Sequence, residues 1–340
     1  MQKPSLRQRA LGALAGVAVG DAMGMPTQTL PRDEIVRAYG VISGFCDAVA
    51  DHPVSGGLKA GTITDDTEQS LLLAQHLISR GGRVDQQAWA EQLLEWERDT
   101  HARGVNDLLG PSTKRAIEAL LRGVPLSETG RLGTTNGAAM RIVPVAIATP
   151  VAPLSVLLDA VEDSCRLTHH TSEAIGSAAA VAAAVSVALD GAGLDTMIAT
   201  ALAAAAEGER RGEPARSGSI RARIAEALDL AEGRSGEEAA LRIAAQIGTS
   251  VSALQSIPMA FAILRLTEAN PWRCALLSAV IGDDTDTIGA IACGMAGAKA
   301  GIGGIPPDAW KLVQSVNHFS LEPAVEGLLR IRAARGGQTA

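Results

Sequence analysis

Aromatic side chains are scarce in this 340-residue chain. One Tyr, three Phe and four Trp amount to 2% of the residues, whereas hydrophobic residues as a whole amount to 47%. The core must therefore be filled mainly by Ala, Leu, Val and Ile. Alanine-rich runs such as 178–184 and 201–206 favour helix, the conformation in which Ala loses the least entropy. We expect closely packed helices with few large rings between them.

An excess of positive charge is also missing, since the formal net charge is −7. Nucleic-acid binding needs a basic face that displaces counterions from phosphates, so we expect no nucleic-acid partner.

Cysteines are few as well. The four present form no CxxC pair and no metal-like spacing, which predicts reduced and mostly buried thiols in a cytoplasmic protein.

Hydrophobic runs of membrane length are absent. Residues 3–25 place LGALAGVAVG after basic residues, as a signal peptide does, but Asp21 ends the apolar run early. The apolar run 174–189 is shorter than a bilayer span. We interpret both segments as buried helices of a soluble protein and expect no membrane partner.

Strand patterns are scarcely present, because alternating β-branched runs are missing, and we therefore predict an all-α fold. Apolar residues at helical spacing predict helices at 65–79, 85–98, 112–122, 153–163, 171–189, 194–206, 219–231, 237–247, 251–267, 271–280, 285–300 and 307–315. We expect one domain over 1–340, with a surface loop at 207–218 and a flexible tail at 331–340. Nothing in the sequence indicates an oligomeric state.

Two short segments concentrate negative charge beside small and apolar residues. Residues 281–290 read IGDDTDTIGA, and residues 61–67 read GTITDDT directly before a helical pattern. Helix capping explains one Asp or Thr in each segment, because their oxygens accept the free N–H groups of a helix start. It does not explain adjacent carboxylates, which resist burial unless a cation compensates them. Oxygen ligands without Cys suit Mg²⁺, Mn²⁺ or Ca²⁺, so the alternative to capping is that both segments meet around one or two ions.

Three further segments place polar residues among small ones. They are GDAMGMPTQ at 20–28, GTTNGAAMRIVP at 133–144 and LTHH at 167–170. Small residues let the backbone approach a ligand closely, and Asn can bond sugar hydroxyls. The structural alternatives are a salt bridge for Arg141, a turn for Asn136 and a purely structural histidine pair.

Taken together, these motifs resemble the ADP-ribosylglycohydrolase family, which includes the dinitrogenase-reductase-activating glycohydrolase. Five motifs occur in the family's order and cover nearly the whole chain: GDAMG at 20–24, TDDT at 64–67, NGAAMR at 136–141, TH at 168–169 and DTDTIG at 284–289. The segments GDAMGMP and TNGAAMR are most similar in sequence to those of uncharacterised bacterial members of the family. For these members a nucleoside substrate is one interpretation.

The resemblance implies a compact, orthogonal multi-helix domain with a central cleft that holds two metal ions, Mg²⁺ or alternatively Mn²⁺. The metal ligands that it implies are Thr64, Asp65, Asp66, Asp284, Asp286 and Thr287. The catalytic residues that it implies are Asp65, Asp66 and Asp284. The residues implied around the ribose and leaving group are Gln28, Asp107, Asn136, Gly137, Met140, Arg141 and His169. Asp283 stands where the family usually has Gly, so we expect it to be dispensable.

The implied reaction is hydrolysis at the anomeric carbon of a ribose, with metal ions that orient the sugar and activate a water molecule. Three hypotheses follow for the substrate: ADP-ribosylated protein or a small ADP-ribose conjugate, a nucleoside or other ribosyl compound, and a non-catalytic relative that binds a ligand. Gln28 departs from the family pattern, where Glu is common, and Gln cannot act as a base. Leu108 and Pro111 also stand where other members show polar residues, and Asp107 is the expected substitute.

Overall fold

The computed structural model describes residues 3–103, 109–214 and 217–337. The described residues form α-helices and one 3₁₀ turn, with two isolated β-bridges and no strand among them. The elements are α1 Leu6–Gly24, α2 Arg32–Tyr39, α3 Asp65–Ser79, α4 Gln86–Ala102, α5 Pro111–Leu121, α6 Gly137–Met140, α7 Val143–Ala148, α8 Leu154–Cys165, α9 Ser172–Leu189, α10 Leu194–Gly208, α11 Ile220–Ala231, α12 Gly236–Ile247, α13 Ala253–Leu266, α14 Pro271–Ser278, α15 Thr285–Ala300, η1 Ile302–Gly304, α16 Pro307–Asn317 and α17 Glu322–Gly336. The all-α prediction is confirmed.

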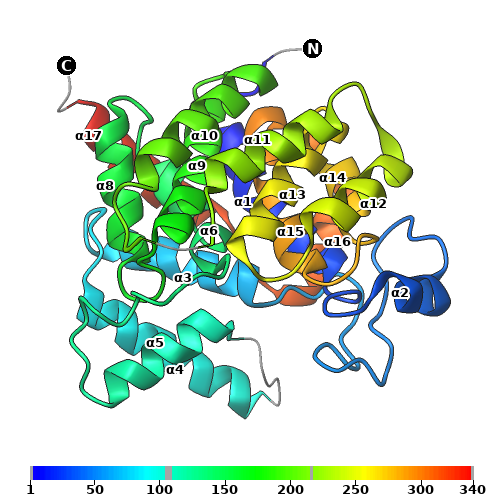
Figure 1. Ribbon diagram of the computed structural model, residues 1–340, viewed down its shortest axis with the longest axis horizontal. Helices are drawn as coiled ribbons and strands as arrows, with labels where there is room; N and C mark the ends of the chain where they lie inside the picture. Colours follow the sequence, from blue (N-terminus) through cyan, green and yellow to red (C-terminus); the bar gives the residue numbers. More distant parts are fainter. Residues whose placement is uncertain (1–2, 104–108, 215–216, 338–340) are drawn as a thin grey trace.

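The arrangement is a bundle of crossing helices rather than a set of parallel ones. Figure 1 shows α1, α9, α13 and α15 in the interior, with α4 and α5 on one side of α3 and α2 with its loops at the other end. The apolar helix α9 is long enough to cross a membrane, but 89% of its apolar window is buried inside the protein. Neighbouring helices therefore cover the apolar surface of α9.

Helices α1 and α15 approach each other through glycines at every fourth residue of α1. A Cβ on Gly16 would lie 2.1 Å from the backbone oxygen of Cys293, and a Cβ on Gly20 would lie 2.1 Å from that of Gly289. Real Cβ atoms do not make such contacts, so only glycine permits this spacing. The close packing fixes the start of α15 against the end of α1, where Gly24 faces the backbone of Asp286.

The predicted flexible tail is wrong for residues 331–336. Helix α17 continues to Gly336 and buries Arg332, whose guanidinium donates to the backbone oxygens of Ala146 and Thr149 and pairs with Asp190. The periodicity of this segment is weak because its charged residues obscure the apolar stripe. Long-range bonds to the carbonyl groups at the end of α7, which sequence patterns do not report, hold the helix in place.

Candidate active site

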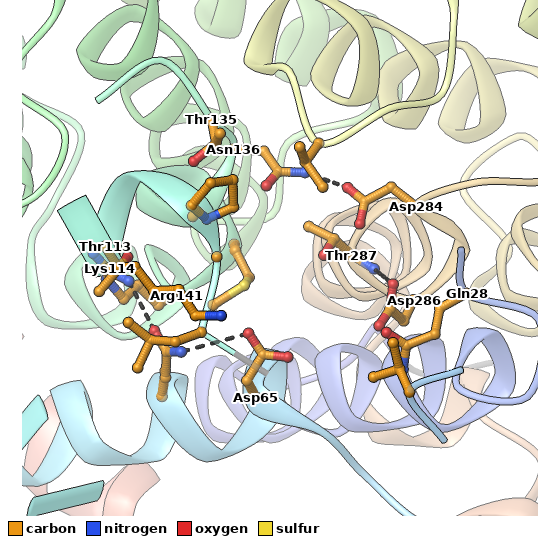
Figure 2. A pocket seen from close by; sticks show the side chains of 18 of the residues that line it. Gln28, Asp65, Thr113, Lys114, Thr135, Asn136, Arg141, Asp284, Asp286 and Thr287 are labelled. Atoms are coloured by element: carbon orange, nitrogen blue, oxygen red, sulfur yellow. Dashed lines mark hydrogen bonds between the residues drawn. The ribbon is translucent and has the colours of Figure 1, made fainter. Parts of the chain in front are cut away.

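The two aspartate segments predicted to meet do so, at the starts of α3 and α15. Asp65 and Asp66 open α3, and Asp286 lies in the first turn of α15. One carboxylate oxygen from each of these three residues lies within 4.8 Å of the others. Figure 2 shows Asp65 on one wall of a cavity and Asp284 and Asp286 on the other. Two helix N-termini, more than two hundred residues apart in sequence, thus bring their acids together.

Helix capping does not account for these acids. Thr64 and Asp284 occupy the N-cap positions of α3 and α15, but neither side chain accepts a hydrogen bond from a backbone N–H group of its own helix. Instead Asp284 Oδ2 accepts from Asn136 Nδ2 at 2.5 Å. The hydroxyl of Thr64 donates to Asp21 at 2.7 Å. Helix capping by Thr64 and Asp284 therefore does not explain the polar residues of the two segments.

Asp21 is a supporting residue that the sequence patterns did not single out. It is fully buried on α1 and accepts hydrogen bonds from four groups, the backbone N–H and hydroxyl groups of Thr64 and Thr67. Burial raises the pKa of Asp21 to about 6, although the bonds from Thr67 and Thr64 lower it. Asp21 thereby anchors the first turn of α3 and sets the position of Asp65 and Asp66. Its place in the GDAMG segment was the available signal.

The acids of this cluster resist ionisation in the protein alone. Burial, followed by the neighbouring carboxylates, raises the pKa of Asp65, Asp66 and Asp286 well above the usual value. Burial also raises the pKa of Asp284 to about 7, although the hydrogen bond from Asn136 lowers it. Desolvated carboxylates that repel one another are stable as anions only beside a positive charge.

The donor set fits a divalent cation. Oxygen Oδ1 of Asp66 is buried and has no hydrogen-bond partner among the described residues. Its Oδ2 receives only a long bond of 3.4 Å from the Thr287 hydroxyl. An unpartnered carboxylate oxygen in a buried site is expensive unless a ligand satisfies it. Hard cations prefer carboxylate and hydroxyl oxygens of this kind, so the triad of Asp65, Asp66 and Asp286 can bind a metal ion.

Asp283 differs from its neighbours in both exposure and backbone conformation. It is exposed and has a φ of 63°, a left-handed conformation that favours glycine. Its backbone joins the turn to the segment after Gln28, because its N–H donates to Leu30 and its carbonyl accepts from Thr29. The backbone of Asp283 is thus structural, while its carboxylate lies outside the metal-binding triad.

We therefore expect Asp283→Gly to keep full activity and to leave the free energy of unfolding unchanged or raise it by up to about 1 kcal/mol, since Gly adopts this φ without strain. Asp283→Ala should lower the free energy of unfolding by about 1 kcal/mol for the opposite reason. Urea denaturation of both variants measures the difference. A large loss of activity in Asp283→Gly would show that its carboxylate takes part in the reaction.

The cavity between the acids and α5 has a volume of about 350 Å³. Carboxylates, amides, hydroxyls, apolar side chains and two cations line it. The polar residues include Asp65, Asp284, Asp286, Gln28, Gln69, Asn136 and Thr287. The apolar residues and cations include Val54, Leu109, Pro111, Met140, Val251, Lys114 and Arg141. The cavity therefore offers negative, positive and apolar groups to one ligand.

Arg141 lines this cavity and has no carboxylate partner among the described residues. It is 1% exposed, donates to Gln69 Oε1 at 2.8 Å and to the Thr168 hydroxyl at 2.5 Å, and its Nε has no partner among the described residues. Burial lowers the pKa of Arg141 to about 10, so it stays charged at neutral pH. No acid in the part of the chain that the structure describes forms the salt bridge considered from the sequence. The negative field of Asp65 favours its charge instead.

His169 lies one layer behind the cavity wall. It is fully buried, its Nε2 contacts the Thr135 hydroxyl at 3.0 Å, and its Nδ1 contacts the Thr168 hydroxyl at 2.7 Å. Burial and then Arg141 lower the pKa of His169 well below the usual value, so it is neutral. Its ring also lies within 3.0 Å of where a Cβ of Gly137 would be. His169 thus supports residues that line the cavity and does not line it itself.

The remaining residues implied by the resemblance either line the cavity, lie buried near it or fall outside the described residues. Gln28, Gly137 and Met140 line the cavity, as do Asn136 and Thr287. Thr64 is 1% exposed and lies beneath the acids. Asp107 lies outside the described residues, as does Leu108. Residues that the sequence patterns missed are Gln69 and Lys114, which line the cavity from α3 and α5 without belonging to any motif considered.

The raised pKa values predict that stability falls as pH rises in metal-free protein. Asp65, Asp66 and Asp286 bind protons more tightly in the folded state than in the unfolded chain, where the carboxyl pKa is about 4. Their contribution to the free energy of unfolding is therefore complete below about pH 4 and is lost as pH rises through their folded pKa values. Asp284 behaves in the same way, with a folded pKa of about 7. Millimolar Mg²⁺ should remove this loss at neutral pH by binding the folded state.

Melting temperatures between pH 4 and pH 7, with and without Mg²⁺, measure this effect. Asp286→Asn is the matched control, because it removes one of the coupled acids and should flatten the pH dependence. Equal pH dependence in wild type and Asp286→Asn would contradict the electrostatic account of the cluster.

Comparisons with known proteins agree with this geometry. The family model of ADP-ribosylglycohydrolase matches residues 2–337. The protein named YegU of Escherichia coli K12 is 33% identical over 329 residues, which cover 96% of this chain and 98% of that protein. The ADP-ribosylarginine hydrolase Tri1 of Pseudomonas putida is 29% identical over 94% of this chain and 80% of its own length.

A solved structure, described as an ADP-ribosylglycohydrolase-related protein complex, superposes with a TM-score of 0.66 at 26% identity. It covers 96% of this chain, which in turn covers 99% of that chain. The family match and the resemblance extend over the same helices that carry the acid cluster. The chain therefore belongs to the ADP-ribosylglycohydrolase family and is a hydrolase of the glycosidase type.

Proposed function

We propose that this protein is a magnesium-dependent hydrolase that cleaves the glycosidic bond at the anomeric carbon of a ribose, in ADP-ribosylated protein or a small ADP-ribose conjugate. The observation that carries the proposal is the convergence of Asp65, Asp66 and Asp286 beside an open cavity, with one buried oxygen of Asp66 unpartnered among the described residues. Similarity to an ADP-ribosylarginine hydrolase supports the substrate class.

Charge balance favours two divalent ions over one. Five carboxylates lie at or next to the cavity, those of Asp21, Asp66, Asp284 and Asp286, which are buried, and that of Asp65, which is partly exposed. Two divalent ions together with the Arg141 guanidinium would neutralise all five. A single ion would leave at least two buried negative charges uncompensated, which is costly in a desolvated site. The residues that would hold these ions are Thr64, Thr287 and four aspartates, namely Asp65, Asp66, Asp284 and Asp286.

The residues of the chain have distinct roles in the proposed reaction. Bound metal ions would acidify a water molecule and hold sugar hydroxyls. Asp65, which lines the cavity, would accept the proton of the attacking water. The water oxygen bonds to the anomeric carbon as the bond to the leaving group breaks, and the leaving nitrogen or oxygen keeps the electron pair and takes up a proton from solvent. The carboxylates of Asp284 and Asp286 stabilise the positive charge that develops on the sugar.

A nucleoside or another ribosyl compound is the second candidate substrate. The described residues that line the cavity include no aromatic side chain. An adenine ring is commonly bound by stacking on such a side chain, so the cavity lacks the usual platform for the adenine of ADP-ribose. A ribosyl compound without an adenine ring would not need one.

One experiment separates the candidates. Purified protein with Mg²⁺ is incubated with ADP-ribosyl-arginine, ADP-ribosyl-serine and a panel of nucleosides, and released products are separated by chromatography. We expect release of ADP-ribose from at least one conjugate. Release of ribose from nucleosides alone would replace the first substrate class by the second. No turnover of any compound by metal-bound protein would favour the non-catalytic alternative, against which the intact aspartates argue.

The metal assignment has its own test by calorimetric titration with Mg²⁺ and Mn²⁺. Asp65→Ala and Asp284→Ala should lose binding, and titrations identical to those of the wild type would defeat the assignment. We further propose that the chain acts as a single catalytic domain in the cytoplasm. Three of its four cysteines are buried and all four are free thiols, which agrees with a reducing compartment.

A further inference from the structure

A second cavity lies at the far end of α3, between the turn that follows this helix and α17. Its volume is about 410 Å³. Because α3 has 15 residues, the cavity lies about 20 Å along the helix from the acid cluster. Eight described residues line it, and none of them is an acid. Three are arginines, namely Arg83, Arg330 and Arg335, and we call this space the arginine cavity.

Glycines set the distance between the two walls of the arginine cavity. A Cβ on Gly327 of α17 would lie 2.5 Å from Ile78 Cδ1 of α3. A Cβ on Gly82, in the turn after α3, would lie 2.6 Å from Ile331 Cγ2 of α17. Gly82 also has a φ of 88°, a conformation that favours glycine. The fold therefore holds the turn and α17 close together and fixes the backbone that carries the three arginines.

Two of these arginines are exposed and have no ion pair or side-chain hydrogen bond among the described residues, namely Arg83 and Arg330. The acids nearest to them in sequence are engaged elsewhere. Glu326, one helical turn before Arg330, pairs with Arg7 at 3.3 Å. Asp85, two residues after Arg83, caps the start of α4. Both guanidinium groups are thus available to a ligand.

The third arginine is half-buried and is held by neutral groups. Arg335 Nη2 donates to the backbone oxygen of Gly82 at 2.5 Å, and its Nη1 donates to the Thr149 hydroxyl. Asp163 of α8 acts on Arg335 through its charge, but Asp163 pairs with Arg166 at 3.6 Å. Three like charges therefore border one cavity with little compensation, in a protein whose formal net charge is −7. Such charges repel one another, and a bound anion relieves the repulsion.

We propose that the arginine cavity binds a small phosphate-bearing anion and is a second ligand site, separate from the active site. Guanidinium groups match phosphate oxygens with paired N–H donors, and several together suit a multiply charged group. The apolar residues of the lining, Ile78, Ile331 and Ala334, leave room for an uncharged part of the ligand. Free inorganic phosphate and a nucleoside diphosphate share this chemistry. The proposal does not depend on the proposed function.

The test is an NMR titration of the full chain at saturating Mg²⁺, first with inorganic phosphate and then with ADP. The backbone amide signals of Gly81 and Gly327 report on the arginine cavity, and that of Gly137 reports on the active site. We expect saturable shifts of Gly81 and Gly327 with both probes. Tighter binding of ADP than of phosphate identifies a nucleoside diphosphate as the preferred ligand, and equal binding identifies the phosphate group alone.

Substitution of the two exposed arginines locates the binding. Arg83→Gln and Arg330→Gln should each raise the dissociation constant about tenfold, the effect of one charge-assisted hydrogen bond. The matched control is Arg221→Gln, which removes an exposed arginine from α11, outside the cavity, and should leave the dissociation constant unchanged. Circular dichroism establishes that each variant is folded.

Three results would overturn the proposal. The first is the absence of saturable shifts of Gly81 and Gly327 at millimolar phosphate and ADP. The second is that potassium chloride of equal ionic strength produces the same shifts, since this would show only screening of a basic surface. The third is an equal dissociation constant for wild type and Arg330→Gln. A shift of Gly137 alone would assign ADP binding to the active site and would also contradict a second site.

Discussion

Asp286→Asn is expected to reduce kcat/KM about a thousandfold, a loss typical of removing one charged group that stabilises a transition state. The substitution keeps the size and shape of the side chain but removes one of the three carboxylates whose oxygens lie within 4.8 Å of each other. A neutral amide binds a hard cation weakly and cannot stabilise positive charge on the sugar. The measurement is the initial rate of ADP-ribose release from ADP-ribosyl-arginine at saturating Mg²⁺.

The control is Asp283→Asn, which makes the same chemical change three residues earlier at an exposed position. This variant should keep nearly all activity. Metal-free Asp286→Asn should also melt no lower than wild type at neutral pH, because the change relieves repulsion among buried carboxylates. Activity of Asp286→Asn within tenfold of wild type would contradict the role given to this carboxylate.

Gly16→Ala is expected to lower the free energy of unfolding by about 3 kcal/mol, the upper range for overpacking a core. The new Cβ would lie 2.1 Å from the backbone oxygen of Cys293 and 2.7 Å from its carbonyl carbon. Backbone atoms in the middle of a buried helix cannot move aside as a flexible side chain can. Helices α1 and α15 would have to separate, with loss of packing along their length. Urea denaturation followed by circular dichroism measures the change.

Gly336→Ala provides the matched control, because it makes the same substitution near the end of α17, where a Cβ meets open space. It should be neutral or slightly stabilising, since Ala has the higher helix propensity. Equal stability of wild type and Gly16→Ala would show that the glycines of α1 are not required for its contact with α15.

Much of the fold was predictable because apolar periodicity is a local property. The helix predicted at 65–79 has the observed bounds of α3, and the helix predicted at 285–300 has those of α15. The short helices α2 and α7 were not predicted. Helix α2 is eight residues long with one buried residue, and α7 is a six-residue apolar run containing Pro144, so neither shows a repeating stripe.

The candidate site was partly predictable for a different reason. Adjacent carboxylates are costly to bury, so their presence beside apolar residues indicates a cation even when the fold is unknown. The hydrogen bonds that position the site residues were not predictable in this way. The bonds from Thr64 and Thr67 to Asp21 join segments that are distant in sequence. Such contacts depend on the tertiary fold and leave no periodic trace.

The central claim is that acids from the starts of α3 and α15 hold divalent cations at the end of a ligand cavity. Anomalous diffraction from crystals grown with Mn²⁺ tests it most directly, because the signal locates the metal independently of activity. We expect anomalous peaks among the carboxylates of Asp65, Asp66 and Asp286, with a second ion near Asp284. Crystals of Asp286→Asn should lose at least one peak. Wild-type crystals without a peak between α3 and α15, at Mn²⁺ concentrations that support hydrolysis, would contradict the account.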